Sequence, residues 1–210
     1  MNTQNPNIRT SIIFAKLTLS VALLLLATAY ISPRHLAIRC TINIKADSRI
    51  VLATIANPES FINWNPWSKY DTAVVFRTSR NSFGIIDRIS WSSPNNHELF
   101  GSLLYLKSKS ENQQEIIADF GRQGNGHFIF HSVSINPQNT LLILEFKTDF
   151  GMNPMTRLYG ITARWWMEDD LELALERIKS LSEQRIKNSS PNQISPMLNS
   201  DLDVLAINCH

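Results

Sequence analysis

The chain has 210 residues, of which 43% are hydrophobic and 18% charged, a size that suits one domain with appendages. Its formal net charge of +2 is too near neutral to argue for a nucleic-acid-binding surface. Two cysteines, Cys40 and Cys209, are too few for a disulfide scaffold or a cysteine-rich zinc site.

The first element is an apolar segment over residues 12–31, IIFAKLTLSVALLLLATAYI, with Lys16 as its one charge. A helix of about 20 apolar residues spans a bilayer, and a lysine near its end can snorkel to the headgroups. We therefore expect a transmembrane anchor over residues 11–32, after a tail of residues 1–10. The alternative is a cleaved signal peptide, because Ala27-Thr28-Ala29 resembles a small-residue cleavage site. A buried core helix is least favoured, since residues 21–26 have no polar face.

The orientation of this span is not decided by its flanking charges. Arg9 and Lys16 precede its core while Arg34 and Arg39 follow it, so the positive-inside count is a tie. The segment also resembles an export signal, which favours placing the folded part outside the cytoplasm.

A strand and two short helices are expected next. Residues 36–47 alternate apolar and polar positions, which predicts a half-buried strand. Its apolar side consists of Ile38, Cys40, Ile42 and Ile44. Asp47 or Ser48 can cap a helix ending near Ile55, and Asn57-Pro58 stops it and starts a second helix to about residue 63.

Six further strands are predicted between residues 72 and 148. They cover residues 72–78, 85–91, 98–107, 113–120, 127–135 and 140–148. The breaks between them are short and rich in turn formers, so consecutive antiparallel pairing is the economical arrangement. With the first strand, this gives a seven-stranded antiparallel sheet.

The last predicted element is one long amphipathic helix over residues 154–187, with Gly160 as the place for a bend. Its apolar stripe must cover a large surface, and the concave face of the sheet is the obvious one. Residues 188–210 form a polar tail that we expect to be poorly ordered. A Cys40–Cys209 bridge is conceivable in an oxidising compartment, but the place of Cys209 in this tail argues against it.

The order of these elements, an α+β pattern of one strand, two short helices, six strands and a long helix, is that of the helix-grip fold. Here the sequence resembles the SRPBCC superfamily of START-like and polyketide-cyclase-like proteins, in particular a bacterial polyketide-cyclase-like group that carries an N-terminal membrane segment. The resemblance rests on residues 42–71, which contain FINWNPWSKYD, and on residues 87–103 and 158–183. It covers the predicted domain, residues 36–187.

That resemblance implies a scaffold in which the long helix closes the sheet over an apolar pocket that takes a hydrophobic or amphipathic ligand. It also implies a single-pass protein of the bacterial inner membrane. The group has no shared catalytic motif to carry over, and this fold hosts transport, sensing and catalysis.

Five residues are the candidate ligand-binding positions: Trp67, Asp87, Trp91, His131 and Trp165. Asp87 shares a strand face with Trp91 that could line the cavity, although an exposed face is the more economical interpretation. Trp165 and Trp166 put one indole toward the sheet and the other toward a flank. Pro66 fixes a turn between the short helices and the second strand, which we call the corner. There we expect Trp64 to help pin the helices to the sheet and Trp67 to pack at the corner or edge the pocket mouth.

No metal or cofactor site is expected. His127 and His131 would lie about 13 Å apart on a strand, too far for one metal ion to bridge. The glycines of GRQGNGH, residues 121–127, lack the Lys-Ser/Thr and helix of a phosphate loop, so they predict a hairpin turn. Asp169 and Asp170 point about 100° apart on a helix and cannot act as a paired acid and base.

The sequence thus favours a membrane-anchored module that binds a hydrophobic or lipid-like small molecule and is not an enzyme. One alternative is a cyclase, dehydratase or hydrolase using Asp87, His131 or Tyr105, at least two of which would have to converge within about 6 Å. Another is a structural protein with a collapsed cavity and an apolar surface patch.

Overall fold

The computed structural model describes residues 6–97, 99–121, 124–189 and 207–210. Its helices are α1 (Pro6–Ile31), α2 (Ser48–Ala56), α3 (Phe61–Trp64) and α4 (Pro154–Ser189), with two 3-10 turns, η1 (Pro58–Ser60) and η2 (Trp67–Lys69). Its strands are β1 (His35–Ile44), β2 (Val75–Arg80), β3 (Ile86–Ser92), β4 (Phe100–Tyr105), β5 (Gln113–Asp119), β6 (Asn125–Asn136), β7 (Asn139–Asp149) and β8 (Asn208–Cys209).

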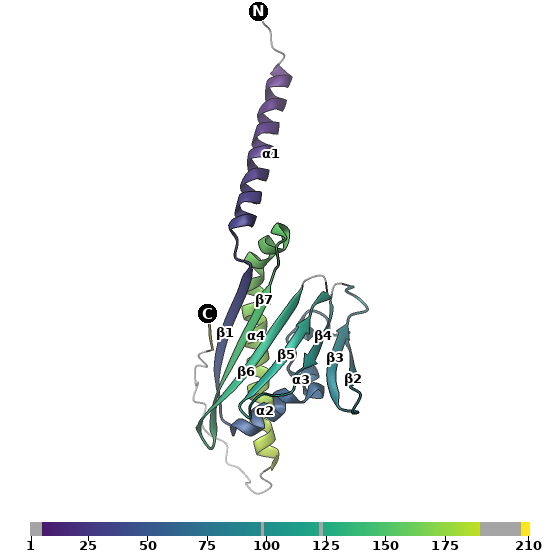
Figure 1. The fold of residues 1–210 in the computed structure, drawn as a ribbon, viewed down its shortest axis with the longest axis vertical. Helices are drawn as coiled ribbons and strands as arrows, with labels where there is room; N and C mark the ends of the chain where they lie inside the picture. Colours follow the sequence, from purple (N-terminus) through teal and green to yellow (C-terminus); the bar gives the residue numbers. More distant parts are fainter. Residues whose placement is uncertain (1–5, 98, 122–123, 190–206) are drawn as a thin grey trace, which may run out of the picture.

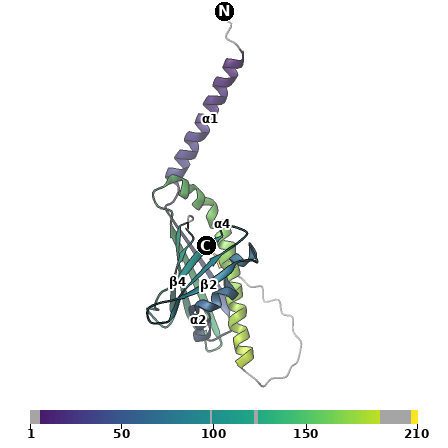
Figure 2. The same cartoon turned by 90° about the vertical axis from the view of Figure 1, so that its right-hand side faces the viewer.

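One antiparallel sheet carries the domain, in the order β2-β3-β4-β5-β6-β7-β1-β8. The long helix α4 lies across one face of this sheet (Figure 1), and its first turns run at an angle to the remainder (Figure 2). This is the predicted α+β helix-grip arrangement. The prediction of seven strands was wrong, because the described part of the chain contains an eighth, β8, at the edge beyond β1.

The core lies between the sheet and α4. Alternate residues of β1 are buried from Leu36 to Ile44, as their period-two pattern predicted. They pack with the inner faces of β6 and β7 and with the stripe of α4. The fully buried members with the largest side chains include Phe61, Phe130, Phe146, Ile38, Ile42, Leu142 and Leu144.

Of the four short helical segments before β2, α2 and η1 each begin with a side-chain cap. Asp47 accepts a hydrogen bond from the Arg49 amide at the start of α2, and Asn57 accepts one from Glu59 at the start of η1. Trp64 then packs edge-on against Phe61 at 4.8 Å and against Phe130 of β6 at 6.1 Å. The indole of Trp64 therefore pins the helices to the sheet, as expected.

Helix α1 stands outside the folded domain (Figure 1). Residues 10–31 of it are long and apolar enough to cross a membrane or to serve as a signal sequence. A salt bridge stabilises the junction between α1 and the domain: Arg34 Nη2 lies 2.7 Å from Asp149 Oδ2. The Arg34 guanidinium keeps the pKa of Asp149 well below its usual range. Arg157 of α4 also donates to the Tyr30 carbonyl oxygen at 3.4 Å.

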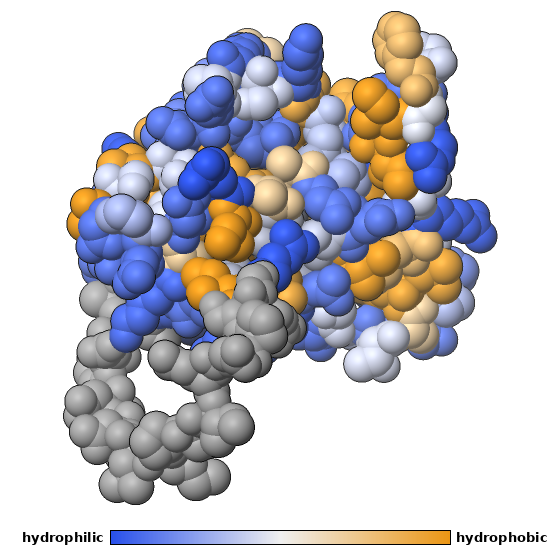
Figure 3. Space-filling view, turned by 90° about the horizontal axis from the view of Figure 1, so that it is seen from below, coloured by the Kyte–Doolittle hydropathy of each residue, from blue (hydrophilic) through white to orange (hydrophobic). Residues whose placement is uncertain are grey.

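The direction of β1 fixes which loops lie near α1. Strand β1 begins next to α1 and runs away from it. Each pair of neighbouring strands from β2 to β7, and the pair β7–β1, is antiparallel. The β3–β4, β5–β6 and β7–α4 connections therefore share the end beside α1, which we call the α1 end. The opposite end shows separate apolar patches between hydrophilic residues (Figure 3). Exposed Phe83 and Ile85 lie in the β2–β3 turn.

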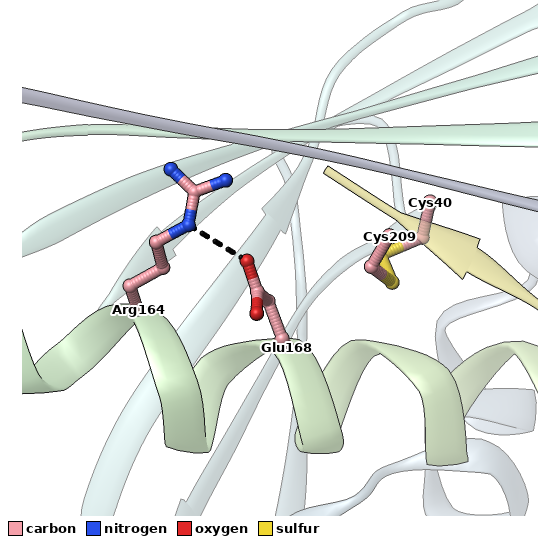
Figure 4. Close-up of a disulfide and its surroundings, with 4 residues drawn as sticks. All are labelled: Cys40, Arg164, Glu168 and Cys209. Carbon is pink, nitrogen blue, oxygen red and sulfur yellow. Dashed lines mark hydrogen bonds and ion pairs between the residues drawn. A yellow bond between two sulfur atoms is a disulfide. The ribbon is translucent and has the colours of Figure 1, made fainter.

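A disulfide joins Cys40 of β1 to Cys209 of β8, beside α4 (Figure 4). Reciprocal backbone hydrogen bonds of 2.9 and 3.0 Å between Arg39 and His210 hold the same edge. The expectation that Cys209 would stay unpaired in the tail was wrong, since a two-residue strand gives no periodic signal. Residues 190–206, most of the predicted tail, lie outside the described residues.

Candidate functional site

A pocket of about 430 Å³ opens at the α1 end of the domain, between the sheet and the first turns of α4. Residues of the β3–β4 loop, the end of β7 and α4 border it. Nine of its sixteen lining residues are aromatic: Trp67, Tyr70, Trp91, Phe100, Phe120, Phe146, Phe150, Tyr159 and Trp166. A mainly apolar concavity of this size is typical of a small-molecule site.

Stacked aromatic rings build the sheet-side wall. Trp67 stacks on Trp91 with ring centroids 4.8 Å apart and planes 16° from parallel. Phe120 meets Trp67 edge-on at 5.4 Å. Gly101, opposite Trp91 on the neighbouring strand, has no side chain, and a Cβ there would collide with the Trp91 ring. A glycine is therefore what allows Trp91 to lie flat in the wall.

The other half of the space under α4 is filled. The cavity remaining there has a volume of only about 10 Å³, and it is bordered by Phe61, Trp64, Phe130 and Leu171 among others. Trp67, Met167 and Asp170 border both this packed region and the open pocket. These three residues therefore mark the floor of the pocket.

Asp170 brings a charge to that floor. It is 0% exposed, and its Oδ1 lies 2.7 Å from Lys69 Nζ and accepts a hydrogen bond from the Tyr70 hydroxyl at 3.0 Å. Its other oxygen, Oδ2, is buried and has no hydrogen-bond partner among the described residues. Thus Lys69 and Tyr70 both contact Oδ1 of Asp170, whereas Oδ2 has no hydrogen-bond partner among the described residues.

Burial raises the pKa of Asp170, and the nearby Lys69 ammonium offsets this only in part. Burial lowers the pKa of Lys69, but its contacts with Asp170 outweigh that, so the net shift is upward. Burial and the Asp170 carboxylate both raise the pKa of the Tyr70 hydroxyl. The arrangement is a lysine–aspartate ion pair with a tyrosine hydroxyl donating to the same carboxyl oxygen.

The corner, residues 65–71, supplies Lys69 and Tyr70. Hydrogen bonds connect it to α4 and to the β3–β4 loop. Asn65 is buried, and its side-chain oxygen accepts from the Ser68 amide at 2.9 Å. Arg177 of α4 donates to the Asn65 carbonyl oxygen and to Ser68 Oγ. On the other side, Asp71 accepts from the Ser93 hydroxyl of the β3–β4 loop. The corner is therefore a rigid support for one wall of the site.

The structure brings two of the five predicted positions to the pocket, Trp67 and Trp91. Trp165 is 72% exposed, and its neighbour Trp166 lines the pocket instead. Asp87 is half-buried at a bulge where β2 and β3 lose register. His131 is half-buried on the sheet face away from α4, between the inward residues of β6. That any of these five binds a ligand remains a prediction.

Two of the three acid–base candidates considered from the sequence, Tyr105 and His131, do not converge. Tyr105 is buried on the inner face of β4, while His131 lies on the outer face of β6, and the two strands are separated by β5. Among the described residues, no group of three or more His, Cys, Asp or Glu side chains could hold a metal ion.

Sequence reasoning missed the residues that make the site polar. Asp170 was considered only together with Asp169, whereas its partners Lys69 and Tyr70 lie about a hundred residues earlier in the chain. The signal that was available is an aspartate on the apolar stripe of α4, one position before Leu171.

Comparison with known proteins gives the fold. No protein-family model and no curated protein sequence matches the chain. Norcoclaurine synthase from Thalictrum flavum superposes with a TM-score of 0.54 at 9% identity, covering 77% of this chain and 92% of that one. The Zhui aromatase/cyclase from Streptomyces sp. R1128 gives 0.51 at 10% identity, covering 74% and 98%. A protein from Arthrobacter aurescens gives 0.51 at 14% identity, covering 71% and 87%.

These likenesses show that the chain has the helix-grip fold. The pocket of this chain lies between the sheet and the C-terminal helix of that fold. At such low identities the likeness says nothing about which molecule enters it.

Proposed function

We propose that the chain is a membrane-anchored binding module that holds a hydrophobic or lipid-like small molecule in the aromatic pocket, with the domain outside the cytoplasm. The observation that carries this proposal is the position of the pocket. It opens at the end of the domain from which the apolar helix α1 departs. If α1 spans a bilayer, an apolar molecule has a short path from the lipid to the site.

The open volume also favours binding over a purely structural role. A collapsed cavity was the expectation for a structural protein, yet about 430 Å³ is open at the α1 end. The norcoclaurine synthase of similar fold was solved with dopamine and hydroxybenzaldehyde, two small aromatic molecules. In this chain, nine aromatic side chains line the pocket, which suits an apolar or aromatic occupant.

The disulfide supports the proposed compartment. Structural disulfides form and persist in oxidising surroundings such as the periplasm and are rare in the cytosol. The Cys40–Cys209 bridge therefore suggests a location outside the cytoplasm, which is where a segment such as α1 would direct the domain, as an anchor or as an export signal.

Ligand binding can be tested with a dodecyl chain that carries a photoactivatable diazirine. The full-length protein would be placed in lipid nanodiscs, irradiated with the probe and mapped by mass spectrometry. We expect cross-links in the β3–β4 loop and in the first turns of α4. Cross-links to α1, formed within the bilayer, serve as the internal reference.

Ala163 gives the variant that discriminates. It is buried and lines the pocket, so Ala163→Phe fills the site and should reduce pocket cross-links several-fold relative to α1. Thr162→Phe, which adds the same ring at the exposed neighbouring position, should behave like the wild type. Absence of pocket cross-links in the wild type, or equal labelling of Ala163→Phe, would overturn the proposed function.

A further inference from the structure

The floor of the pocket carries one carboxylate oxygen to which no described residue donates a hydrogen bond of ordinary geometry. Asp170 is fully buried and lines the pocket. Lys69 and Tyr70 both approach Oδ1, and Oδ2 is left without a partner among the described residues. A buried polar atom that lacks a hydrogen bond costs about 1–3 kcal/mol, more if charged, so it favours any ligand that supplies a donor.

We propose that Asp170 Oδ2 is a polar subsite for the hydroxyl group of an amphipathic ligand, whose apolar part occupies the aromatic pocket and extends toward the α1 end. This inference rests on the proposed function and specifies its ligand class. The hydroxyl would lie at the floor, where the open pocket meets the packed core.

Charge decides which head group fits. Lys69 already pairs with the Asp170 carboxylate at 2.7 Å, so the pair is neutral as a whole. A ligand ammonium would add an uncompensated buried cation beside Lys69, and a ligand carboxylate would place an anion against Oδ2. Both are costly in a buried site. A neutral hydroxyl donates one hydrogen bond and brings no charge.

The geometry of the corner keeps the acceptor in place. Asp170 is held through Lys69 and Tyr70, and the same corner is bound to α4 by Arg177. The side chain of Trp67, which lines the pocket, lies close enough to the Asp170 carboxyl to favour its charged form, but it makes no hydrogen bond of ordinary geometry to Oδ2. An acceptor held in this way loses little freedom when a ligand binds, which is the benefit of preorganisation.

The test compares unlabelled competitors of the dodecyl diazirine probe on the full-length protein in nanodiscs. The competitors are dodecanol, its methyl ether and dodecanoate. We expect dodecanol to displace the probe from the pocket at concentrations about tenfold lower than the methyl ether, the effect of one hydrogen bond to a charged group. Dodecanoate should compete less well than dodecanol.

Two variants assign the preference to Asp170. Asp170→Leu keeps the size but removes the acceptor, so the alcohol and the ether should compete equally, while Asp169→Leu, an exposed neighbour, should retain the tenfold difference. If the wild type binds the probe but does not distinguish alcohol from ether, the subsite is refuted and the proposed function stands. If the wild type does not bind the probe at all, the proposed function fails first.

The outcome does not depend on the folding of Asp170→Leu, because the comparison of competitors on the wild type already decides the question. Should this variant fold and keep the preference for the alcohol, another group makes the contact and the assignment to Asp170 is overturned.

Discussion

Trp64 and Trp67, three residues apart, have different roles, and the difference comes from the turn between them. Pro66 ends the short helix α3 and starts η2, so the indoles on either side of it point in different directions. Trp64 enters the packed core against Phe61 and Phe130. Trp67 stacks on Trp91 in the pocket wall. The sequence motif is thus partly a core anchor and partly a component of the candidate site.

The core role of Trp64 predicts a large loss of stability. Trp64 is 5% exposed, so Trp64→Ala should lower the free energy of unfolding by roughly 3–5 kcal/mol. Trp165→Ala, at a 72% exposed position, should change it by less than about 0.5 kcal/mol. Denaturant unfolding followed by circular dichroism measures both. Equal effects in the two variants would contradict the packing described for Trp64.

Asp170 predicts a dependence of stability on pH. Burial raises its pKa in the folded state above the ordinary value of 3.8, so the folded state binds this proton more tightly than the unfolded state. The stability that it contributes is fully present below pH 3.8 and is lost as the pH rises through the folded-state pKa. Relative to Asp170→Asn, the wild type should therefore lose stability as the pH rises above 4, by up to about 1.4 kcal/mol per pH unit.

The measurement is a series of denaturant titrations from pH 4 to 7 on the wild type and on Asp170→Asn. Lys69 remains protonated across this range, so loss of its partner adds only a constant offset. Asp169→Asn at the exposed neighbouring position is the control for surface charge. A difference between wild type and Asp170→Asn that does not vary with pH would show that the carboxyl is not destabilised by burial.

At the residue scale, the sequence predicted packing better than it predicted the site. The buried face of β1 and the place of Trp64 follow from local pattern. Which of Trp165 and Trp166 faces the pocket depends on the rotation of α4 about its axis, where one residue changes direction by about 100°. The Asp170–Lys69 contact joins residues about a hundred positions apart, and the local sequence around either residue does not predict it.

Among the elements, long periodic segments were predictable and short ones were not. The sequence predicted α4 over residues 154–187 and the structure has it over Pro154–Ser189. The predicted strands of the sheet also match in number and order up to β7. Strand β8 has two residues, and its pairing with β1 is a long-range contact. A disulfide and two backbone hydrogen bonds, rather than any pattern of its own, account for it.

The disulfide predicts that reduction destabilises the domain. Its cysteines are 169 residues apart, and closing so long a loop restricts the unfolded chain strongly, although the entropic account of this effect is model-dependent. Cys209→Ala should lower the free energy of unfolding by about 2–5 kcal/mol, and a reductant should lower that of the wild type by a similar amount. Cys209 is the better site for the change because Cys40 is fully buried.

Thermal unfolding with and without reductant measures this effect. Cys209→Ala serves as its own control, since a reductant should have no further effect on a chain that cannot form the bridge. A wild type that is insensitive to reductant while Cys209→Ala is destabilised would assign the loss to packing of the Cys209 side chain.

For the whole molecule, the arrangement places three features at one end: the apolar helix α1, the mouth of the pocket and the first turns of α4. The apolar side chains exposed near this end include Met152, Met155 and Tyr30. Tyrosine is enriched in the interfacial region of a bilayer, so the position of Tyr30 would suit that region if α1 spans the membrane. Function as proposed requires that α1 remain attached to the domain, since otherwise the pocket mouth has no fixed relation to the lipid.

Retention of α1 can be separated from its use as a signal peptide. A signal peptidase would act after Ala29, with Ala27 as the second small residue of its recognition site. Ala27 is exposed on α1, so Ala27→Phe blocks such cleavage while the segment stays apolar.

For a retained anchor we expect wild type and variant to behave alike. The full 23.9 kDa chain should stay in carbonate-washed membranes. Protease added to the outside of spheroplasts should digest the domain. Release of a shorter wild-type chain, with Ala27→Phe retained in the membrane, would show that α1 is removed. The pocket would then act in a soluble protein.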